Sequence, residues 1–205
     1  EMASEILNAH LSSQEETIFG NLLEELAIHI NFSVYGGSKA EENVWKSIDL
    51  IFDRDGKRYL VGIKSGPNWG NADQQAAMRS NFKKARAQVL ASGWSGEIVC
   101  VNGVMYGQDA SPLKQDKDPE KVFFKYCGQD FWSLISGDDN LYKTIIKPLD
   151  KKAKERDDEF RKLVTTTTNR LTRELLERFS KNDELDWDSI VDFVSKRKRT
   201  EKPEF

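Results

Sequence analysis

Two charged side chains lie on a hairpin whose pattern would bring them together. Asp49 stands within one apolar, strand-like run, and Lys64 ends a second run that follows Asp55-Gly56. Asp-Gly between two such runs is a strong hairpin signal, so we expect Asp49 and Lys64 to face one another across neighbouring strands. An isolated charge in a sheet is costly and needs a partner, a metal ion or water. The pair is therefore either a salt bridge at a strand end or part of an active site.

The loop that follows Lys64, residues 65–71, combines two glycines, a proline and two asparagines with Trp69. Such a loop makes a tight turn with exposed hydrogen-bond donors. Trp69 could stack on a base or fill a groove. The alternative is a plain strand-to-helix loop that covers the indole ring.

A third chemical feature is the pair Glu24-Glu25 in the first predicted helix. This helix is expected to start at Ser12 or Ser13 and to end at Asn31 and the glycine pair 36–37. The side chains expected on its buried stripe are Ile18, Leu22, Leu26 and Ile30. Glu25 lies beside this stripe, so it could reach the edge of the sheet. A position on the surface is the alternative.

The elements that must position these residues alternate between strands and helices. Strands are expected at 46–53, 58–64, 97–101 and 121–127, and helices at 72–91, 129–135, after Pro148 and at 187–196. This order predicts an α/β fold in which a mixed central sheet is flanked by helices. Residues 1–142 would form the core and residues 143–205 a helical C-terminal region.

Composition excludes several classes of protein. The 205 residues are 38% hydrophobic and 32% charged, which excludes a disordered chain and a disulfide scaffold. No apolar run approaches the length of a membrane span. The two cysteines, Cys100 and Cys127, lie in strand-like segments and are expected to be buried free thiols, as in a reducing cytoplasm. Histidines and cysteines are too scattered for a zinc site, and no Gly-Lys-Ser/Thr phosphate loop occurs.

The distribution of charge is uneven although the net charge is only −3. Residues 143–181 and the tail from Ser195 carry net positive charge, whereas the body before them is acidic. This pattern fits local contact with a polyanion, and it also fits ordinary solvated helices.

Taken in order, the segments resemble the PD-(D/E)XK nuclease superfamily, and type II restriction endonucleases in particular. No single segment is specific, but the ordered set covers most of the chain from Phe19 to about Lys181. The segments that carry the resemblance are residues 19–25, 47–49, 54–57, 62–66, 104–107 and 127–132. The resemblance implies a restriction-endonuclease-like sheet, with residues 1–142 as a PD-(D/E)XK-like catalytic core, and Mg²⁺-dependent cleavage of double-stranded DNA.

The resemblance also implies roles for the residues of the hairpin. Asp49 would be the main metal ligand, because hard cations take carboxylate oxygens, and the Ile63 carbonyl would add a second oxygen. Lys64 would orient or deprotonate the attacking water and offset phosphate charge. A bound cation neutralises the phosphate and lowers the pKa of water.

One position departs from the family pattern. Gly62 stands where these enzymes usually carry Asp or Glu, two residues before the lysine. Three readings follow: Glu25 supplies the missing carboxylate as a third catalytic and metal-binding residue, residue 62 is an inactivating substitution, or the protein binds DNA without cutting it. We favour Glu25, which matches the helix position of the family.

The helix after the loop approaches DNA in such enzymes, so its polar side chains are candidate contacts. Arg79, Lys83 and Arg86 follow helical spacing, with Lys84 alongside, and are candidate phosphate contacts. Asparagine and glutamine can pair with adenine. The alternative for any one of them is a solvated surface. The full set of predicted DNA-binding residues is Asn68, Trp69, Asn71, Gln74, Gln75, Arg79 and Lys83.

These inferences combine into a prediction of a type II restriction endonuclease from the bacterial or archaeal cytoplasm, part of a restriction–modification system. It would use Mg²⁺ to cleave a short palindromic site as a homodimer, because a two-fold protein matches a two-fold target. Residues 143–205 would contact DNA or form the dimer. The alternatives are a structure-selective repair or junction nuclease of the same superfamily, or a catalytically silent DNA-binding protein.

Overall fold

The computed structural model describes residues 2–182 and 184–196, except for the side chains of residues 15, 16 and 148–157. The chain divides into two compact units, one formed by Glu15–Asp150 and the other by the two ends of the chain, Glu1–Gln14 and Lys151–Phe205. The candidate site residues all belong to the first unit, which is therefore described in more detail.

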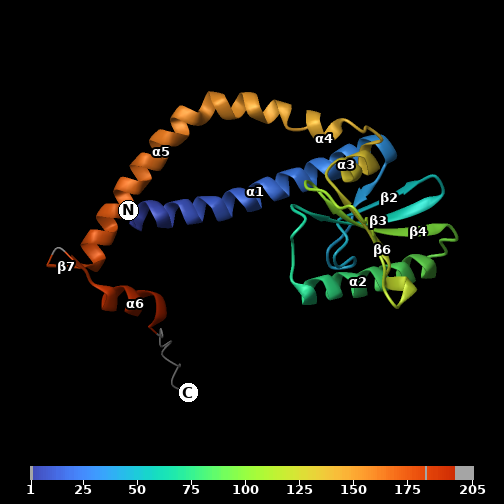
Figure 1. Cartoon of the computed structure of the whole chain (residues 1–205), viewed down its shortest axis with the longest axis horizontal. Coiled ribbons are helices and arrows are strands. Elements are labelled where there is room, and N and C mark those ends of the chain that lie inside the picture. Colours follow the sequence, from blue (N-terminus) through green and yellow to red (C-terminus); the bar gives the residue numbers. More distant parts are fainter. Residues whose placement is uncertain (1, 183, 197–205) are drawn as a thin grey trace, which may run out of the picture. The chain divides into compact units, whose positions relative to one another are not determined.

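A six-stranded mixed sheet forms the centre of the Glu15–Asp150 unit (Figure 1). Its strand order is β1-β2-β3-β4-β6-β5, with parallel pairing of β3 with β4 and of β4 with β6, and antiparallel pairing elsewhere. The strands are β1 (Ser38–Lys39), β2 (Leu50–Arg54), β3 (Lys57–Lys64), β4 (Glu97–Val104), β5 (Leu113–Lys114) and β6 (Phe123–Cys127). The mixed α/β fold predicted from the sequence is confirmed.

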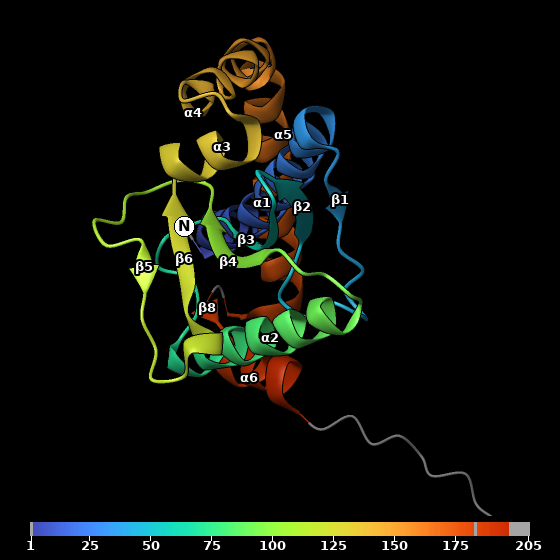
Figure 2. The same cartoon turned by 90° about the vertical axis from the view of Figure 1, so that its right-hand side faces the viewer.

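Helices cover both faces of this sheet. Figures 1 and 2 show α2 (Ala72–Ala91) below the sheet, with α1 (Met2–Tyr35) and α3 (Gln129–Ser136) on the opposite face. Each face has its own apolar core: Leu23 and Ala27 pack with Val61 and Phe131 on one side, and Phe82 packs with Leu60 on the other. The sheet is thus held between two buried layers.

The remaining elements are short or belong to the helical end of the chain. A 3₁₀ turn, η1 (Pro119–Lys121), precedes β6, and α4 (Leu141–Thr144) follows α3. The other unit contains most of α5 (Lys147–Phe179), a small ladder of β7 (Ser180–Lys181) and β8 (Glu184–Leu185), and α6 (Trp187–Ser195). Among the described residues, no helix combines the length and apolar character needed to cross a membrane.

Several boundaries differ from the predicted ones for local reasons. The first helix begins at Met2 rather than at Ser12 or Ser13, and Gly36, with φ +69°, follows its last residue. Asn31 lies within this helix and does not end it. Its side chain is fully buried and donates a hydrogen bond to the distant Ile135 carbonyl instead of capping the helix. The strand expected from residue 46 begins at Leu50, because the preceding residues form turns that end at Ser47, with φ +63°.

Both cysteines are buried and free, as predicted. Burial raises the pKa of the Cys100 thiol to about 11, although the nearby Arg86 opposes the rise. A thiol with this pKa is almost entirely protonated at neutral pH, so the structure gives Cys100 a packing role.

Candidate active site

Asp49 lies immediately before β2 and is fixed by the backbone on both sides. Its N–H donates to the Val61 carbonyl at 2.8 Å, and its carbonyl accepts from the Ala40 N–H at 3.0 Å. Its carboxylate Oδ2 accepts from the Ile63 N–H at 2.6 Å and lies 3.8 Å from Lys64 Nζ. The sequence expectation that Asp49 and Lys64 face one another is therefore confirmed.

Lys64 ends β3 and is only partly committed to Asp49. Its Nζ donates to the Ile63 carbonyl at 2.8 Å and lies 5.7 Å from the centre of the Trp69 ring. The side chains of Asp49 and Lys64 keep 25% and 33% of their surface exposed, so both remain accessible to a ligand. The structure thus gathers the Asp49 carboxylate, the Ile63 carbonyl and the Lys64 amine.

Glu24 brings a second carboxylate to this group from α1. Burial raises the pKa of Glu24, and the negative charge of Asp49 raises it further, whereas Lys39 and Lys64 lower it. A cavity of about 190 Å³ opens at this point. It is lined by Thr17, Gly20, Asn21 and Glu24 of α1 together with Ile63, Lys64, Ser65 and Met105.

Glu25, the predicted third catalytic residue, has an exposed side chain. The predicted stripe is correct for Leu26 and Ile30, which pack against the core, but Ile18 and Leu22 are 65% and 48% exposed. Leu23 and Ala27 are buried instead, so the centre of the buried face lies about one residue from the predicted one. Successive helical residues differ in direction by about 100°, because a turn contains 3.6 residues. The same displacement brings Glu24 toward Asp49 and Lys64, and the role predicted for Glu25 stays a prediction.

Gly62 occupies a position where the backbone leaves no room for a side chain. A Cβ at residue 62 would lie 2.5 Å from the Ser47 carbonyl oxygen, a backbone atom that cannot move independently of the segment leading into Asp49. Any side chain at this position must displace Ser47 or the strand. The reading of residue 62 as a lost acid that a glutamate would restore therefore does not fit this backbone.

The oxygen donors near Lys64 suit a hard cation that keeps part of its water. Asp49 and Glu24 supply carboxylates and Ile63 supplies a carbonyl, and Mg²⁺ is typically bound through one or two carboxylates plus water. Within residues 2–182 and 184–196, no group of three or more His, Cys, Asp or Glu side chains is placed to hold a metal ion. The residues present therefore fit Mg²⁺ but not an all-protein cage.

The predicted DNA-binding residues differ in their surroundings. Trp69, Gln75 and Arg79 line one hollow, and Asn68 and Gln75 are exposed. Asn71 and Gln74 instead bond to each other's backbone as a capping box at the start of α2. That box gives both residues a structural role that the sequence reading had not assigned to them.

Two of the basic residues predicted to contact phosphate, Arg79 and Lys83, are held by acids of the segment before β6. Arg79 lies 3.5 Å from Asp116 and donates to the carbonyls of Gln115 and Lys121. Lys83 pairs with Asp118 at 3.0 Å and Glu120 at 2.7 Å. These partners are more than 30 residues away in sequence, which is why the pattern of α2 alone did not indicate them.

Comparison with known families decides the class of protein. The family model of type II restriction endonuclease EcoO109I matches residues 1–157, which is about three quarters of the chain. The chain belongs to this family of type II restriction endonucleases. No curated protein matches the sequence.

Membership in the EcoO109I family makes the protein a nuclease that binds DNA and cleaves it at specific sites. The matched residues include every candidate site residue and end within α5. The resemblance to type II restriction endonucleases found in the sequence is therefore confirmed.

Proposed function

We propose that this restriction endonuclease hydrolyses phosphodiester bonds of double-stranded DNA with Mg²⁺, at a short palindromic site. The approach of the Asp49 carboxylate to the Lys64 amine beside Glu24 is the observation that carries the proposal. Phosphodiester hydrolysis needs a negatively charged pocket for a cation and a positive group for the phosphate, and this arrangement supplies both.

Asp49 and Glu24 would hold the cation, with the Ile63 carbonyl as a third oxygen donor. When bound, Mg²⁺ neutralises charge on the phosphate and lowers the pKa of water. Lys64 orients the attacking water and offsets the negative charge that develops on the phosphate oxygens. The hydrogen bond from the Ile63 N–H fixes the Asp49 carboxylate before DNA arrives, so less reorganisation is needed on binding.

The active-site proposal is tested by cleavage of unmethylated phage DNA with Mg²⁺ or with EDTA. Wild-type protein should give discrete bands that require Mg²⁺. Asp49→Ala and Lys64→Ala should abolish the bands, and Glu24→Gln should slow cleavage at least a hundredfold, about 2.7 kcal/mol of transition-state stabilisation. Glu25→Gln is the matched control and should retain nearly the wild-type rate, because its side chain is exposed.

The contrary outcomes are equally specific. If Glu24→Gln cleaves DNA at the wild-type rate and Glu25→Gln does not cleave it, Glu25 is the catalytic glutamate. If wild-type protein shifts DNA in a gel but leaves it intact with Mg²⁺, the protein is a catalytically silent binder, the alternative that Gly62 favours. Nicks that follow DNA structure rather than sequence would indicate a repair or junction nuclease.

We also propose that the enzyme acts as a homodimer, because two catalytic centres related by a two-fold axis can cut both strands of a palindrome. An exposed apolar stripe on α6 supports this arrangement. Trp187, Val191 and Val194 are 60%, 56% and 70% exposed. Apolar side chains gathered in this way commonly mark a protein interface, and a second copy of this chain is the partner that the two-fold target requires.

A further inference from the structure

The basic residues of α2 differ sharply in what surrounds them. Arg79 and Lys83 are paired with acids of the segment before β6, and Arg86 donates to the carbonyls of Ile98 and Val122. Lys84, the remaining basic residue of this helix, forms neither an ion pair nor a hydrogen bond within the described part of the chain. Its positive charge is therefore available to a ligand.

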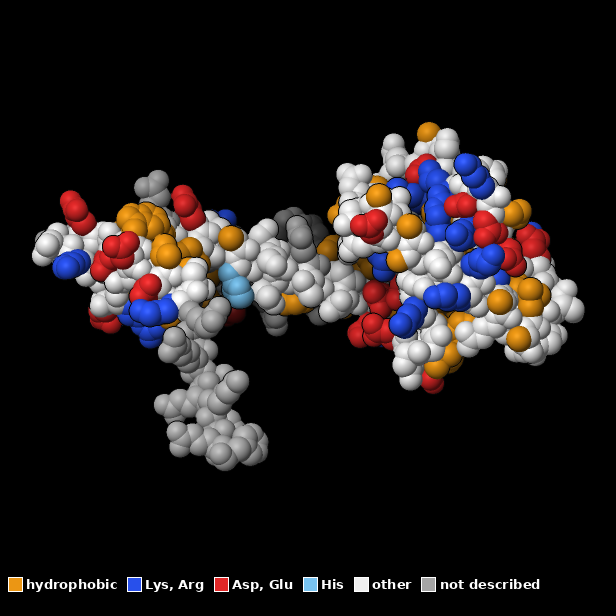
Figure 3. Space-filling view, turned by 90° about the horizontal axis from the view of Figure 1, so that it is seen from below, with side chains coloured by type: hydrophobic (Ala, Val, Ile, Leu, Met, Phe, Trp, Pro, Cys, Tyr) orange, Lys and Arg blue, Asp and Glu red, His pale blue; other side chains and the backbone are white. Residues whose placement is uncertain are grey.

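Figure 3 faces the side of the compact unit that carries α2, and Lys and Arg side chains gather on this side with Asp and Glu among them. Some of these charges form ion pairs within the fold, as Arg79 does with Asp116 and Lys83 with Asp118. An anion would therefore bind where a basic side chain has no acidic partner, rather than where basic side chains are most numerous.

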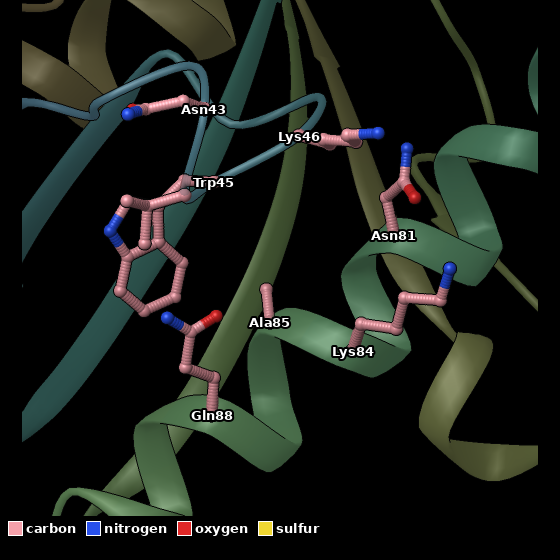
Figure 4. A pocket seen from close by; sticks show the side chains of 8 residues that line it. Asn43, Trp45, Lys46, Asn81, Lys84, Ala85 and Gln88 are labelled. Carbon is pink, nitrogen blue, oxygen red and sulfur yellow. The ribbon is translucent and has the colours of Figure 1, made fainter.

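Lys84 lines a pocket together with Lys46, a second lysine that has no ion pair or hydrogen bond among the described residues (Figure 4). The pocket measures about 270 Å³ and lies between α2 and the turn before β2. In Figure 4 the ends of Lys46 and Asn81 point toward one another, and Lys84 extends from α2 on the same side. The remaining lining residues are Asn43, Val44, Trp45, Ala85 and Gln88, so no acid contributes to the lining.

Two contacts join this pocket to the catalytic segment. Asn81 donates to the Ser47 hydroxyl at 2.8 Å, and the Ser47 carbonyl lies against Gly62. Ser47 is two residues before Asp49, so the wall of the pocket and the catalytic carboxylate are carried by the same short segment. Substitution of Gly62 by a larger residue would disturb both.

The separation of Lys46 and Asp49 suits neighbouring phosphates of one DNA strand. Three residues of extended chain span at most about 10 Å. Phosphates of one strand of B-DNA follow one another about every 3.4 Å along the helix axis. A phosphate at Lys46 would therefore lie within a few nucleotides of the phosphate at Asp49.

We propose that Lys46 and Lys84 form a phosphate-binding clamp that positions the DNA backbone beside the cleaved bond. The two amines neutralise backbone charge, the amides of Asn43, Asn81 and Gln88 supply hydrogen-bond donors, and Trp45 provides an apolar wall for the sugar. The position of the clamp relative to the cleaved bond rests on the proposed function, whereas the phosphate contact itself does not.

The clamp is tested by the salt dependence of DNA binding in EDTA, where neither cleavage nor the Mg²⁺ proposal affects the result. The probe is a short duplex of mixed sequence, and affinity is measured by fluorescence anisotropy over a range of salt concentrations. Each lost phosphate contact reduces the slope of log K against log salt by about 0.9. The double variant Lys46→Ala/Lys84→Ala should therefore reduce the slope by about 1.8.

The matched control removes two lysines of the same unit that lie outside the pocket. Lys57 pairs with Glu97 at 2.8 Å, and Lys117 is exposed in the segment before β6. Lys57→Ala/Lys117→Ala should leave the slope unchanged, and Lys46→Arg/Lys84→Arg should restore it. An unchanged slope in the pocket variant, or an equal reduction in the control, would overturn the clamp. Thermal unfolding of each variant checks that the fold is intact.

Discussion

At the scale of single residues, the site depends on which glutamate of α1 faces the sheet. Thr17, Gly20, Asn21 and Glu24 follow the spacing of one helical face and together line the cavity beside Lys64. The predicted buried stripe included Ile18 and Leu22, which are exposed, whereas the helix buries Leu23 and the small Ala27 beside Leu26 and Ile30. Alanine gives a weak apolar signal, so the predicted stripe was centred about one residue away and selected Glu25 instead of Glu24.

The raised pKa of Glu24 predicts that the site is maintained at a cost in stability. Because the folded-state pKa lies above the ordinary value of 4.5, the folded protein binds this proton more tightly than the unfolded chain. The stability that this group contributes is complete below the ordinary value and is lost as pH rises through the folded-state pKa. Once it has lost its proton, Glu24 is therefore a half-buried negative charge beside Asp49 that opposes folding.

Glu24→Gln should consequently raise the melting temperature at neutral pH in EDTA, and the gain should shrink as the pH falls toward 4.5. The measurement is thermal unfolding of both proteins across this pH range. Glu25→Gln, whose side chain is exposed, should melt like the wild type throughout. A gain that persists unchanged at low pH would contradict the assignment, since the amide would then stabilise the fold for reasons other than charge.

At the scale of elements, the hairpin of β2 and β3 is the part that the sequence predicts best. Asp55-Gly56 gives the turn, the apolar runs on either side of it give the strands, and these two features alone bring Asp49 to Lys64. The bounds of α2 agree with the predicted 72–91. The pairing of Lys83 with Asp118 and Glu120 was not predictable in the same way, because it depends on tertiary contact between α2 and a distant loop.

The close approach of this hairpin to Ser47 makes Gly62 a structural requirement. Gly62→Ala should destabilise the protein by about 1–3 kcal/mol, the usual cost of overpacking, because its Cβ would meet a backbone carbonyl at 2.5 Å. Gly20→Ala is the matched control. Gly20 lies within a helix, and an added Cβ there would meet the end of the Ser65 side chain, so this change should stabilise by up to about 1 kcal/mol.

Urea unfolding of the two alanine variants measures these opposite shifts. For the same reason, Gly62→Glu should lower the rate of DNA cleavage rather than raise it, although it restores the residue type that the family pattern favours. A folded Gly62→Glu variant that cleaves DNA faster than the wild type would contradict this prediction. It would show that the backbone at Ser47 moves to admit a side chain, and that the site had lacked an acid.

At the scale of the whole molecule, the sequence predicted the mixed sheet and its covering helices, but not how the ends of the chain combine. Glu1–Gln14 and Lys151–Phe205 form one compact unit although they are far apart in sequence. The sequence predicted the helices of the C-terminal part but not the helix before Ser12, and helical periodicity does not show which helices share a unit. A surface for a partner, such as the apolar stripe on α6, is likewise recognised only when the structure shows which apolar side chains are exposed.

The apolar stripe on α6 therefore leads to the last prediction, which concerns assembly. Burying one large apolar side chain contributes about 1.5–3 kcal/mol, so placing two carboxylates in such an interface should remove several kcal/mol of dimer stability. Val191→Asp/Val194→Asp should shift the mass measured by light scattering from dimer to monomer. Asp188→Lys, an exposed charge reversal on the same helix, should remain dimeric.

Loss of the dimer should also change the products of cleavage. A monomer presents one catalytic centre to a palindromic site, so supercoiled plasmid should accumulate as nicked circles instead of linear DNA. Wild-type protein that is monomeric yet produces linear DNA would contradict the two-fold arrangement. A Val191→Asp/Val194→Asp variant that stays dimeric would place the interface elsewhere, and the exposed residues of α1, such as Ile18 and Leu22, are then the next apolar surface to substitute.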